Sequence, residues 1–359
     1  MSVATGESVP VLAICVPTFN RAANLGNLFR SLGVVKERLG DDIEICVSNN
    51  GSTDDTRAVI EEFGCKHEVV ALHQPANLGA TVNITAVAGM MRARWGIWCG
   101  DDDEVDADAI ESIVDRLRSL AADTWVLVDC ADLEGRGQYM HHFAEGEHTA
   151  AAFQCAILRS GLDPFGFMGV HVFPRSAASM LQDMKVEDTK PWPPIVAMLR
   201  FIMRPGTRVH VLREIAIMQA KGGAVLFWSG GDLARIRIAK LRLLWRTRLN
   251  SAGHAGFLRL MMLREMYSLG SLKAIAAWKL YEGEDYDRSA VTAYLEASSW
   301  MGVLLPLAVP YALLALALRI LPHRAYAGFF RLTGQGGFLS RYQQLKRELG
   351  VFDGIKRGL

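Results

Sequence analysis

The chain has 359 residues, of which 50% are hydrophobic and 21% are charged, and no low-complexity tract interrupts it. This composition excludes an intrinsically disordered protein and leaves room for one large domain with an appendage or for two domains. The net charge of +1 hides an asymmetry of 15 Lys/Arg against 28 Asp/Glu over residues 1–190, and of 24 against 10 over residues 191–359. We expect a cation site in the acidic half and a polyanionic ligand, either nucleic acid or anionic lipid, for the basic half.

Six cysteines are scattered along the chain without a C-x-x-C pair. This pattern disfavours a disulfide framework or a zinc site and fits a reducing compartment. The first ten residues lack the basic and apolar regions of a signal peptide. We therefore expect the catalytic part of the protein to lie in the cytosol.

Short β-rich apolar runs alternate with stretches of helical periodicity between residues 11 and 103. The runs predicted as strands cover residues 11–16, 43–47, 68–73 and 95–99, and the stretches predicted as helices cover roughly 22–33, 54–63 and 80–92. Continuous apolar strands separated by helices are typical of a parallel sheet that is covered on both faces. The predicted fold class is therefore α/β, with a Rossmann-like, mostly parallel sheet flanked by helices.

Polar segments follow three of these strands, at residues 17–21 (PTFNR), 48–53 (SNNGST) and 100–103 (GDDD). Ligands of open parallel sheets bind beyond the carboxyl ends of the strands, so we expect the three segments to converge on one rim. The alternative is three independent turns, in which Ser52 or Thr53 caps the helix that follows.

Three consecutive carboxylates, Asp101, Asp102 and Asp103, end an apolar run, and such a crowded cluster needs a neutralising partner. A hard divalent cation such as Mg²⁺ or Mn²⁺ prefers carboxylate oxygens and completes its shell with water and phosphate oxygens. The alternative is a solvated acidic turn that caps the next helix, because Asp106 and Asp108 continue the acidity. The chain has no G-x-G-x-x-G or G-K-[ST] motif, which disfavours a dinucleotide or P-loop site.

Four ordered motifs resemble the GT-A domain of glycosyltransferase family 2. They are PTFNR (17–21), SNNGSTDDT (48–56), NLGATVN (77–83) and WCGDDD (98–103). The Asn-Gly-Ser-Thr and Gly-Asp-Asp-Asp versions are most similar to the abequosyltransferase-like branch of bacterial polysaccharide enzymes. The resemblance covers about residues 9–130. It implies a metal-dependent enzyme that inverts the anomeric centre of a sugar delivered by a nucleoside diphosphate.

The resemblance also implies roles for individual residues. Asp103 is the expected ligand of Mn²⁺ or Mg²⁺, with Asp101 beside it, while Asp101 and Asp102 face the ribose, the donor sugar or metal-bound water. The nucleotide-sugar is expected to contact Pro17, Thr18, Asn20, Arg21, Asn49, Asn50, Asn77, Gly79, Asp101 and Asp102. Asn49 and Asn50 stand where the family uses Asp, and an amide, which both donates and accepts, can change which base is read. Asn77 and Gly79 are alternatively part of an ordinary loop.

An inverting displacement needs a carboxylate base within reach of the acceptor hydroxyl. By the same resemblance this base is expected in the pair Glu187 and Asp188, with Asp188 preferred. The alternative is a surface acidic pair before the proline-rich turn at 191–194. Residues 165–173 resemble the acceptor-side strand of the family, with aromatics that fit a core and His171 as a strand histidine rather than a base.

The second half is basic and apolar. Residues 297–318 carry no charge and are long enough to span a bilayer. The tail from Arg319 holds eight Lys/Arg and two acidic residues, so a re-entrant or in-plane segment at 297–321 satisfies the positive-inside tendency better than a single span. Six Lys/Arg alternate with apolar residues over 232–249, as in a helix that lies on an anionic leaflet. The alternative is a buried helical hairpin in a soluble domain.

We therefore predict a GT-A catalytic domain over residues 1–225, with a nucleotide-sugar half (9–130) and an acceptor half (131–225), and a helical, membrane-associating region over 226–359. The expected partners are a nucleoside-diphosphate sugar, a polyprenyl-linked glycan acceptor and an anionic membrane at the cytoplasmic face of the inner membrane. No nucleic-acid motif is present, and the oligomeric state is left open. One alternative is a sugar-nucleotide nucleotidylyltransferase. The other is a non-catalytic membrane scaffold with a degenerate GT-A fold, and the pair Asn49–Asn50 is the only feature that favours this scaffold.

Overall fold

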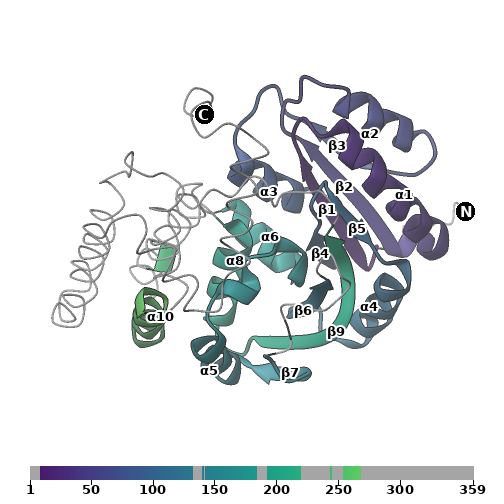
Figure 1. Ribbon diagram of the computed structural model, residues 1–359. Helices are drawn as coiled ribbons and strands as arrows, with labels where there is room; N and C mark the ends of the chain where they lie inside the picture. Colours follow the sequence, from purple (N-terminus) through teal and green to yellow (C-terminus); the bar gives the residue numbers. More distant parts are fainter. Residues whose placement is uncertain are drawn as a thin grey trace, which may run out of the picture. The chain divides into compact units, whose positions relative to one another are not determined.

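The computed structural model describes residues 9–131, 140, 142–183, 192–219, 243–244 and 254–267 (Figure 1). The chain divides into two compact units, of which the first comprises residues 1–224 and 250–257 and the second residues 225–249 and 258–359. The helix α10 (Ala255–Tyr267) crosses this division in sequence. The candidate site belongs to the first unit, and the description below concerns that unit.

The first half of this unit alternates strands and helices as the sequence predicts. Four strands pair in parallel in the order β3-β2-β1-β4, and they are β1 (Leu12–Thr18), β2 (Ile43–Asn49), β3 (Val70–His73) and β4 (Trp95–Trp98). Between them lie α1 (Ala22–Leu39), the 3-10 turn η1 (Gly40–Asp42), α2 (Thr56–Gly64) and α3 (Ala80–Gly89). The two neighbouring strands β1 and β2 are mostly apolar and are buried on both faces, which is the usual environment of parallel pairing.

The helix α1 is longer than the predicted 22–33. Its buried face continues from Leu25 and Leu28 through Leu32 to Val35 at helical spacing, so packing against the sheet extends the helix beyond the predicted end. The helix ends at Gly40, whose φ of 51° lies in the left-handed region that glycine adopts most readily.

The second half of the unit adds strands of mixed direction. They are β5 (Asp103–Val105), β6 (Thr124–Ala131), β7 (Gly146–Thr149), β8 (His171–Pro174) and β9 (Arg208–Gln219). Within the described residues they complete a nine-stranded sheet in the order β3-β2-β1-β4-β8-β6-β9-β5, with β7 also beside β9. β8 runs antiparallel to β4 and β6, whereas β6 and β9 are parallel to each other. The predicted parallel arrangement is therefore found from β1 to β4 and gives way to mixed pairing beyond β4.

Helices and short turns connect these later strands. They are α4 (Ala107–Ser119), α5 (Ala150–Ser160), η2 (Asp163–Phe165), η3 (Met168–Val170), α6 (Arg175–Gln182) and α8 (Pro193–Ile202). α8 is buried all round except at its last turn, so it belongs to the core rather than to the surface.

The sheet curls, and the curl determines where the three carboxylates lie. β5 follows β4 after only a short link in the chain, yet it pairs at the far end of the sheet with β9, which arches through this half (Figure 1). Asp103 stands opposite Gln219 on one side of β9, and Cys130 of β6 stands opposite Ile217 on the other. The link from β4 to β5, residues 99–102, therefore lies where the curled sheet turns back on itself.

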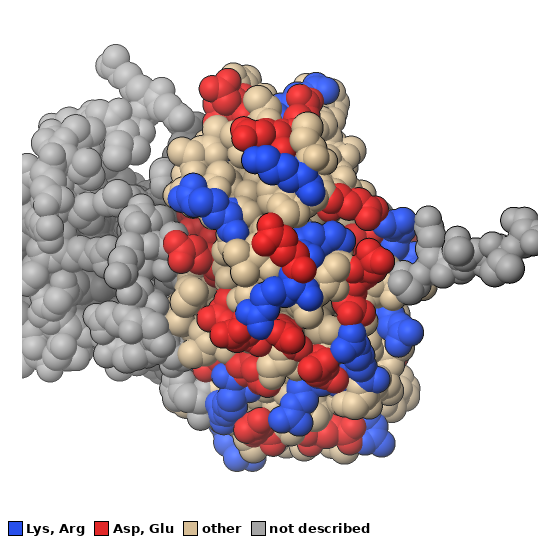
Figure 2. All heavy atoms as spheres, turned by 90° about the vertical axis from the view of Figure 1, so that its right-hand side faces the viewer, with Lys and Arg blue, Asp and Glu red and all other residues tan. Residues whose placement is uncertain are grey.

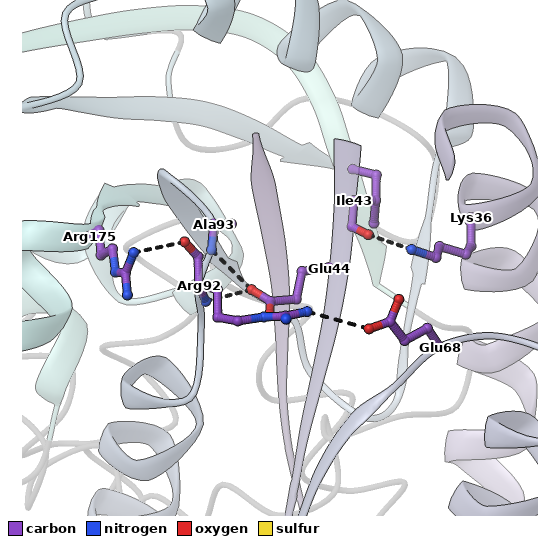
Figure 3. Close-up of polar contacts among 7 residues, drawn as sticks. All are labelled: Lys36, Ile43, Glu44, Glu68, Arg92, Ala93 and Arg175. Carbon is purple, nitrogen blue, oxygen red and sulfur yellow. Dashed lines mark hydrogen bonds and ion pairs between the residues drawn. The ribbon is translucent and has the colours of Figure 1, made fainter. Parts of the chain in front are cut away.

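At the opposite edge of the sheet, Glu44 fixes the start of β4 (Figure 3). Its buried carboxylate accepts bonds from the backbone N–H groups of Arg92 at 2.7 Å and Ala93 at 3.0 Å, and from Arg92 Nε at 2.9 Å. Glu68 accepts from the same guanidinium at 3.4 Å, and Arg175 donates to the Arg92 carbonyl at 3.0 Å. A pocket of about 330 Å³ opens beside this junction. Glu44 and Arg92 in its lining are already bonded within the protein, which makes the junction a structural anchor.

Figure 2 shows acidic and basic side chains interspersed over one face of the described residues, without a large patch of a single sign. Within the described ranges, no helix combines the length and the apolar content that crossing a bilayer requires. The predicted membrane segment 297–321 and nearly all of 232–249 lie outside the described residues.

Candidate functional site

The carboxyl ends of β1, β2 and β4 meet at one edge, as parallel strands must. At this edge the Thr18 hydroxyl donates to Asp101 Oδ2 at 2.7 Å. Arg21 Nη1 forms an ion pair with Asp102 Oδ2 at 3.3 Å. Two residues of the first polar segment thus hold two of the three carboxylates, more than 80 residues away in sequence. The convergence predicted from the sequence is confirmed for these segments.

Asn20 joins the first polar segment to the second. Its backbone N–H donates to Ser52 Oγ at 2.8 Å, and its Oδ1 accepts from the Thr53 N–H at 2.8 Å. Its φ of 52° is uncommon for a residue other than glycine, and asparagine tolerates it best. Ser52 therefore bonds across the site instead of capping α2, and Asp54 accepts the Thr56 N–H at 3.0 Å at the start of that helix. The alternative in which Ser52 or Thr53 is the cap is wrong.

The second and third motifs meet through amide side chains. Asn50 Nδ2 donates to Asn77 Oδ1 at 2.9 Å, and Asn50 Oδ1 accepts from the Leu78 N–H at 2.9 Å. Gly51 allows this approach, because a Cβ there would lie 2.4 Å from the Ala76 carbonyl carbon and its φ is 71°. The loop of Asn77 is therefore tied to the end of β2.

Asn83 is a positioning residue that the sequence reasoning did not select. It is buried on α3, and its Nδ2 donates to the carbonyls of Ser48 at 3.0 Å and Thr18 at 3.3 Å. Its Oδ1 accepts from the Ser48 hydroxyl at 2.6 Å. The Asn83 side chain thus bonds to the ends of both β1 and β2 and holds them together. The available signal was its place as the last residue of the NLGATVN motif.

The three aspartates do not form a solvated helix cap. The cap of α4 is Asp106, whose Oδ1 accepts the Ala109 N–H at 2.9 Å. Asp103 is only 6% exposed, lies at the start of β5, and accepts the Gly100 N–H at 3.2 Å. The alternative of a solvated acidic turn is therefore wrong for Asp103.

Burial makes ionisation of two of these carboxyls costly. Desolvation, and then the negative charge of Asp102, raises the pKa of Asp103 to about 7. Desolvation also raises the pKa of Asp101 to about 6, although the hydrogen bond from Thr18 works in the opposite direction. Near neutral pH, the edge therefore carries carboxylates that a bound cation would stabilise.

The donor set fits Mn²⁺ or Mg²⁺. The described residues hold no group of three or more His, Cys, Asp or Glu side chains arranged around one point. A magnesium-type ion in a nucleotide site does not need such a cage, because one or two carboxylates suffice when phosphate oxygens and water complete the shell. Asp103, a buried carboxylate with a single backbone N–H bond among the described residues, is the group that fits best.

Of the remaining predicted site residues, Pro17 and Gly79 lie within the described part of the chain and the predicted base does not. Pro17 is the penultimate residue of β1, opposite Ser48, half-buried and with an apolar ring. Gly79, with a φ of 88°, precedes α3. Glu187 and Asp188 lie outside the described residues, so the position of the expected base stays a prediction.

His171 lies in the core, as a strand histidine. Its side chain is fully buried, and its Nε2–H donates to the Phe165 carbonyl at 3.0 Å. Burial lowers its pKa to about 4, so it is neutral at physiological pH. Trp98 stacks on Phe173 beside it, with ring centroids 3.8 Å apart. The aromatics of this segment are thus core residues.

Residues 13–183 match the sequence model of Glycosyl transferase family 2. They form a family 2 glycosyltransferase domain. This family 2 domain is similar to abequosyltransferase RfbV of Salmonella typhimurium, with 29% identity over 113 residues that cover 31% of this chain and 34% of that protein. It is also similar to the chondroitin synthase of Escherichia coli, with 29% identity over 119 residues that cover 32% of this chain and 16% of that protein. The chain therefore matches about a third or less of the length of these relatives.

Solved structures share the fold. Staphylococcus aureus TarS 1–349 in complex with UDP has a TM-score of 0.60 at 15% identity, over 90% of this chain and 92% of that chain. The mannosyltransferase PcManGT from Pyrobaculum calidifontis, in complex with GDP-Man and Mn²⁺, has a TM-score of 0.50 at 14% identity, over 90% of this chain and 87% of that chain. At such identities the likeness shows the fold alone, and that fold is the GT-A-like α/β fold with a curled, mixed sheet.

Proposed function

We propose that the protein is a metal-dependent, inverting glycosyltransferase that moves a sugar from a nucleoside diphosphate to a glycan acceptor in bacterial cell-surface polysaccharide synthesis. The observation that carries this proposal is the edge at which Thr18 and Arg21 hold Asp101 and Asp102 beside the buried, unneutralised Asp103. Membership of residues 13–183 in family 2 supports the same reaction class.

The residues of this edge divide the work of donor binding. Asp103, with Asp101 beside it, would hold Mn²⁺ or Mg²⁺, and the ion would supply positive charge for the nucleoside-diphosphate leaving group. The Thr18 hydroxyl keeps Asp101 in one orientation, which also suits a hydrogen bond from a ribose hydroxyl to its other oxygen. Arg21 neutralises Asp102 and stands at the rim, where a guanidinium can also meet a phosphate.

The acceptor hydroxyl must lose its proton as it attacks the anomeric carbon. We assign this task to Asp188, with Glu187 as its neighbour, by the resemblance described above. A carboxylate in hydrogen-bond reach of the hydroxyl is what a single displacement requires. Replacement of Asp188 by Asn should remove transfer while leaving donor binding intact.

We further propose that the acceptor is a polyprenyl-diphosphate-linked sugar at the cytoplasmic face of the inner membrane. The basic and apolar second half supports this, because 24 Lys/Arg against 10 Asp/Glu suit an anionic leaflet and the uncharged run 297–318 suits its apolar interior. A lipid-linked acceptor would require such an attachment.

A donor screen tests the reaction class. The full chain is incubated with a panel of sugar nucleotides and Mn²⁺, and release of the nucleoside diphosphate is scored. We expect slow hydrolysis of one donor, lost in Asp103→Asn and kept in Asp108→Asn, a matched change at an exposed carboxylate of α4. Release of pyrophosphate from a sugar phosphate and a nucleoside triphosphate would instead indicate a nucleotidylyltransferase. Absence of any turnover or metal-dependent binding would indicate a scaffold.

A further inference from the structure

We propose that two asparagines, Asn50 and Asn77, read the nucleotide base through N–H donors and thereby select cytosine over uracil. We refer to these two side chains, together with the neighbouring Asn49, as the amide cluster. The inference rests on the proposed function, because it takes a nucleoside diphosphate to bind at the edge beyond β1 to β4. It goes further by naming the base.

The strand order puts the amide cluster at the base end of such a ligand. In the order β3-β2-β1-β4, the end of β2 is two strands from the carboxylates that follow β4, or about 10 Å at about 4.8 Å per strand. On the other side of β4 the edge begins with the apolar turn η3. A nucleotide whose diphosphate lies near Asp103 would therefore find polar side chains on the side of Thr18 and, beyond it, of the amide cluster.

The orientation of the Asn50 amide is fixed by a group that can only donate. The Leu78 backbone N–H points at Asn50 Oδ1 at 2.9 Å, so this position must be the oxygen. The amide nitrogen then gives one hydrogen to Asn77 Oδ1 at 2.9 Å. Its second hydrogen has no partner among the described residues. Asn50 is 3% exposed and therefore offers this N–H from a rigid position.

The Asn77 amide is fixed in the same way. Its Oδ1 accepts the Gly79 N–H at 2.9 Å as well as the hydrogen from Asn50, so its oxygen is turned into the protein. Its Nδ2 has no partner among the described residues, and the side chain is exposed. Asn77 therefore adds N–H donors next to the one from Asn50.

A backbone N–H also fixes the orientation of the Asn49 amide, but its nitrogen faces His73. Its Oδ1 accepts the Ser52 N–H at 3.1 Å, which assigns the oxygen, and its Nδ2 lies 3.3 Å from His73 Nδ1. The Asn49 amide nitrogen therefore faces the His73 ring. The side-chain oxygens of all three asparagines accept hydrogen bonds from backbone N–H groups. The cluster therefore offers a ligand N–H donors and no negative charge.

Such a surface distinguishes the two pyrimidines. Cytosine offers two adjacent acceptors, O2 and N3, to the N–H groups of Asn50 and Asn77. Uracil keeps the O2 acceptor but carries a hydrogen on N3, which would face the Asn50 N–H and leave that donor unpaired. An unpaired buried donor costs enough to weaken binding about tenfold or more.

Calorimetric titration of CDP and UDP into the full chain with Mn²⁺ tests the proposal. We expect CDP to bind about tenfold or more tighter than UDP. In Asn50→Asp, one oxygen keeps the Leu78 bond and the other becomes an acceptor, so the preference should reverse toward UDP. Asn49→Asp adds the same charge one residue away, beside His73, and should leave the ratio of the two affinities unchanged.

The outcomes separate this inference from the proposed function. Equal affinities, or tighter binding of UDP by the unaltered chain, would overturn the base assignment and leave the glycosyltransferase proposal standing. An unchanged ratio in Asn50→Asp would also overturn it. If neither nucleotide bound with Mn²⁺, both the base assignment and the proposed donor site would be wrong.

Discussion

Asp103 illustrates at the scale of one residue how the fold arranges a carboxylate that suits the proposed cation. It is buried at the start of β5 with a single backbone N–H bond, and its neighbours Asp101 and Asp102 are also acidic. Thr18 and Arg21 serve those two neighbours instead. The fold thus leaves one carboxylate with unsatisfied charge at the position where a metal and a diphosphate would meet.

This arrangement makes the stability of the metal-free protein depend on pH. The pKa of Asp103 is raised from 3.8 to about 7 by burial, so between these values the folded protein holds a proton that the unfolded chain has released. The free energy of unfolding therefore falls as pH rises through this window, by about 2 kcal/mol between pH 5.5 and pH 8 from this group alone. Urea denaturation in EDTA at the two pH values measures the change.

Asp103→Asn is the control for this prediction. It removes the titrating group, so the fall in stability between the two pH values should shrink by about the same 2 kcal/mol. Mn²⁺ with a nucleoside diphosphate should stabilise the unaltered chain at the higher pH but not the variant. A variant with an undiminished pH dependence would show that Asp103 is not the group responsible.

At this scale, the residues in short polar runs were predictable, and the one that bonds from within a helix was not selected. Asp101 to Asp103, Thr18 and Arg21 stand in short polar runs after apolar strands. Asn83 bonds the backbone of two strands from a helix, and apart from its place at the end of the NLGATVN motif its surroundings in the sequence resemble an ordinary helix. Side-chain to backbone bonds of this kind leave no periodic pattern.

Among the elements, the start of β4 depends on Glu44 at the edge opposite the candidate site. Replacing Glu44 by Ala would leave the N–H groups of Arg92 and Ala93 without their acceptor and would remove the buried carboxylate that pairs with the half-exposed Arg92 side chain. We expect the free energy of unfolding to fall by about 3 kcal/mol. Denaturant titration measures this loss.

Glu68→Ala is the matched control, because Glu68 binds the same guanidinium from an exposed position. It should cost less than about 1 kcal/mol. Nucleotide affinity should be unchanged in both variants where they remain folded. Equal losses from the two variants would mean that Glu44 does not anchor the strand.

The elements themselves were predictable as far as the apolar pattern determines them. β1, β2 and β4 are mostly apolar, and their parallel order follows from the intervening helices. β5 has three residues and β9 pairs with strands on both sides, so their places depend on the curl of the sheet. A curl arises from packing over long sequence separations and leaves no local signal.

For the whole molecule, the chain combines an acidic family 2 domain with a basic and apolar second half. If the second half holds the enzyme on a membrane, the protein should sediment with bacterial membranes and resist a high-salt wash. Charge reversal of Arg237, Lys240 and Arg242 to Glu should reduce vesicle binding about a hundredfold or more, because each basic side chain near an anionic surface contributes about 1 kcal/mol. Co-sedimentation with anionic and neutral vesicles measures this.

The same reversal made elsewhere provides the comparison. Changing Arg57 and Lys66, exposed residues at and beside α2, to Glu alters the net charge but not the proposed membrane surface. Vesicle binding should then be unaffected. A chain that never bound vesicles and worked at full rate on free sugars would contradict the membrane attachment.

We propose that the carboxylates after β4 bind a nucleoside diphosphate together with a metal. The decisive experiment is calorimetric titration of a nucleoside diphosphate into the metal-free protein, with and without Mn²⁺. We expect binding that requires Mn²⁺, is lost in Asp103→Asn and is retained in Asp108→Asn. Binding that did not depend on Mn²⁺, or that survived the loss of Asp103, would show that these carboxylates do not hold the metal.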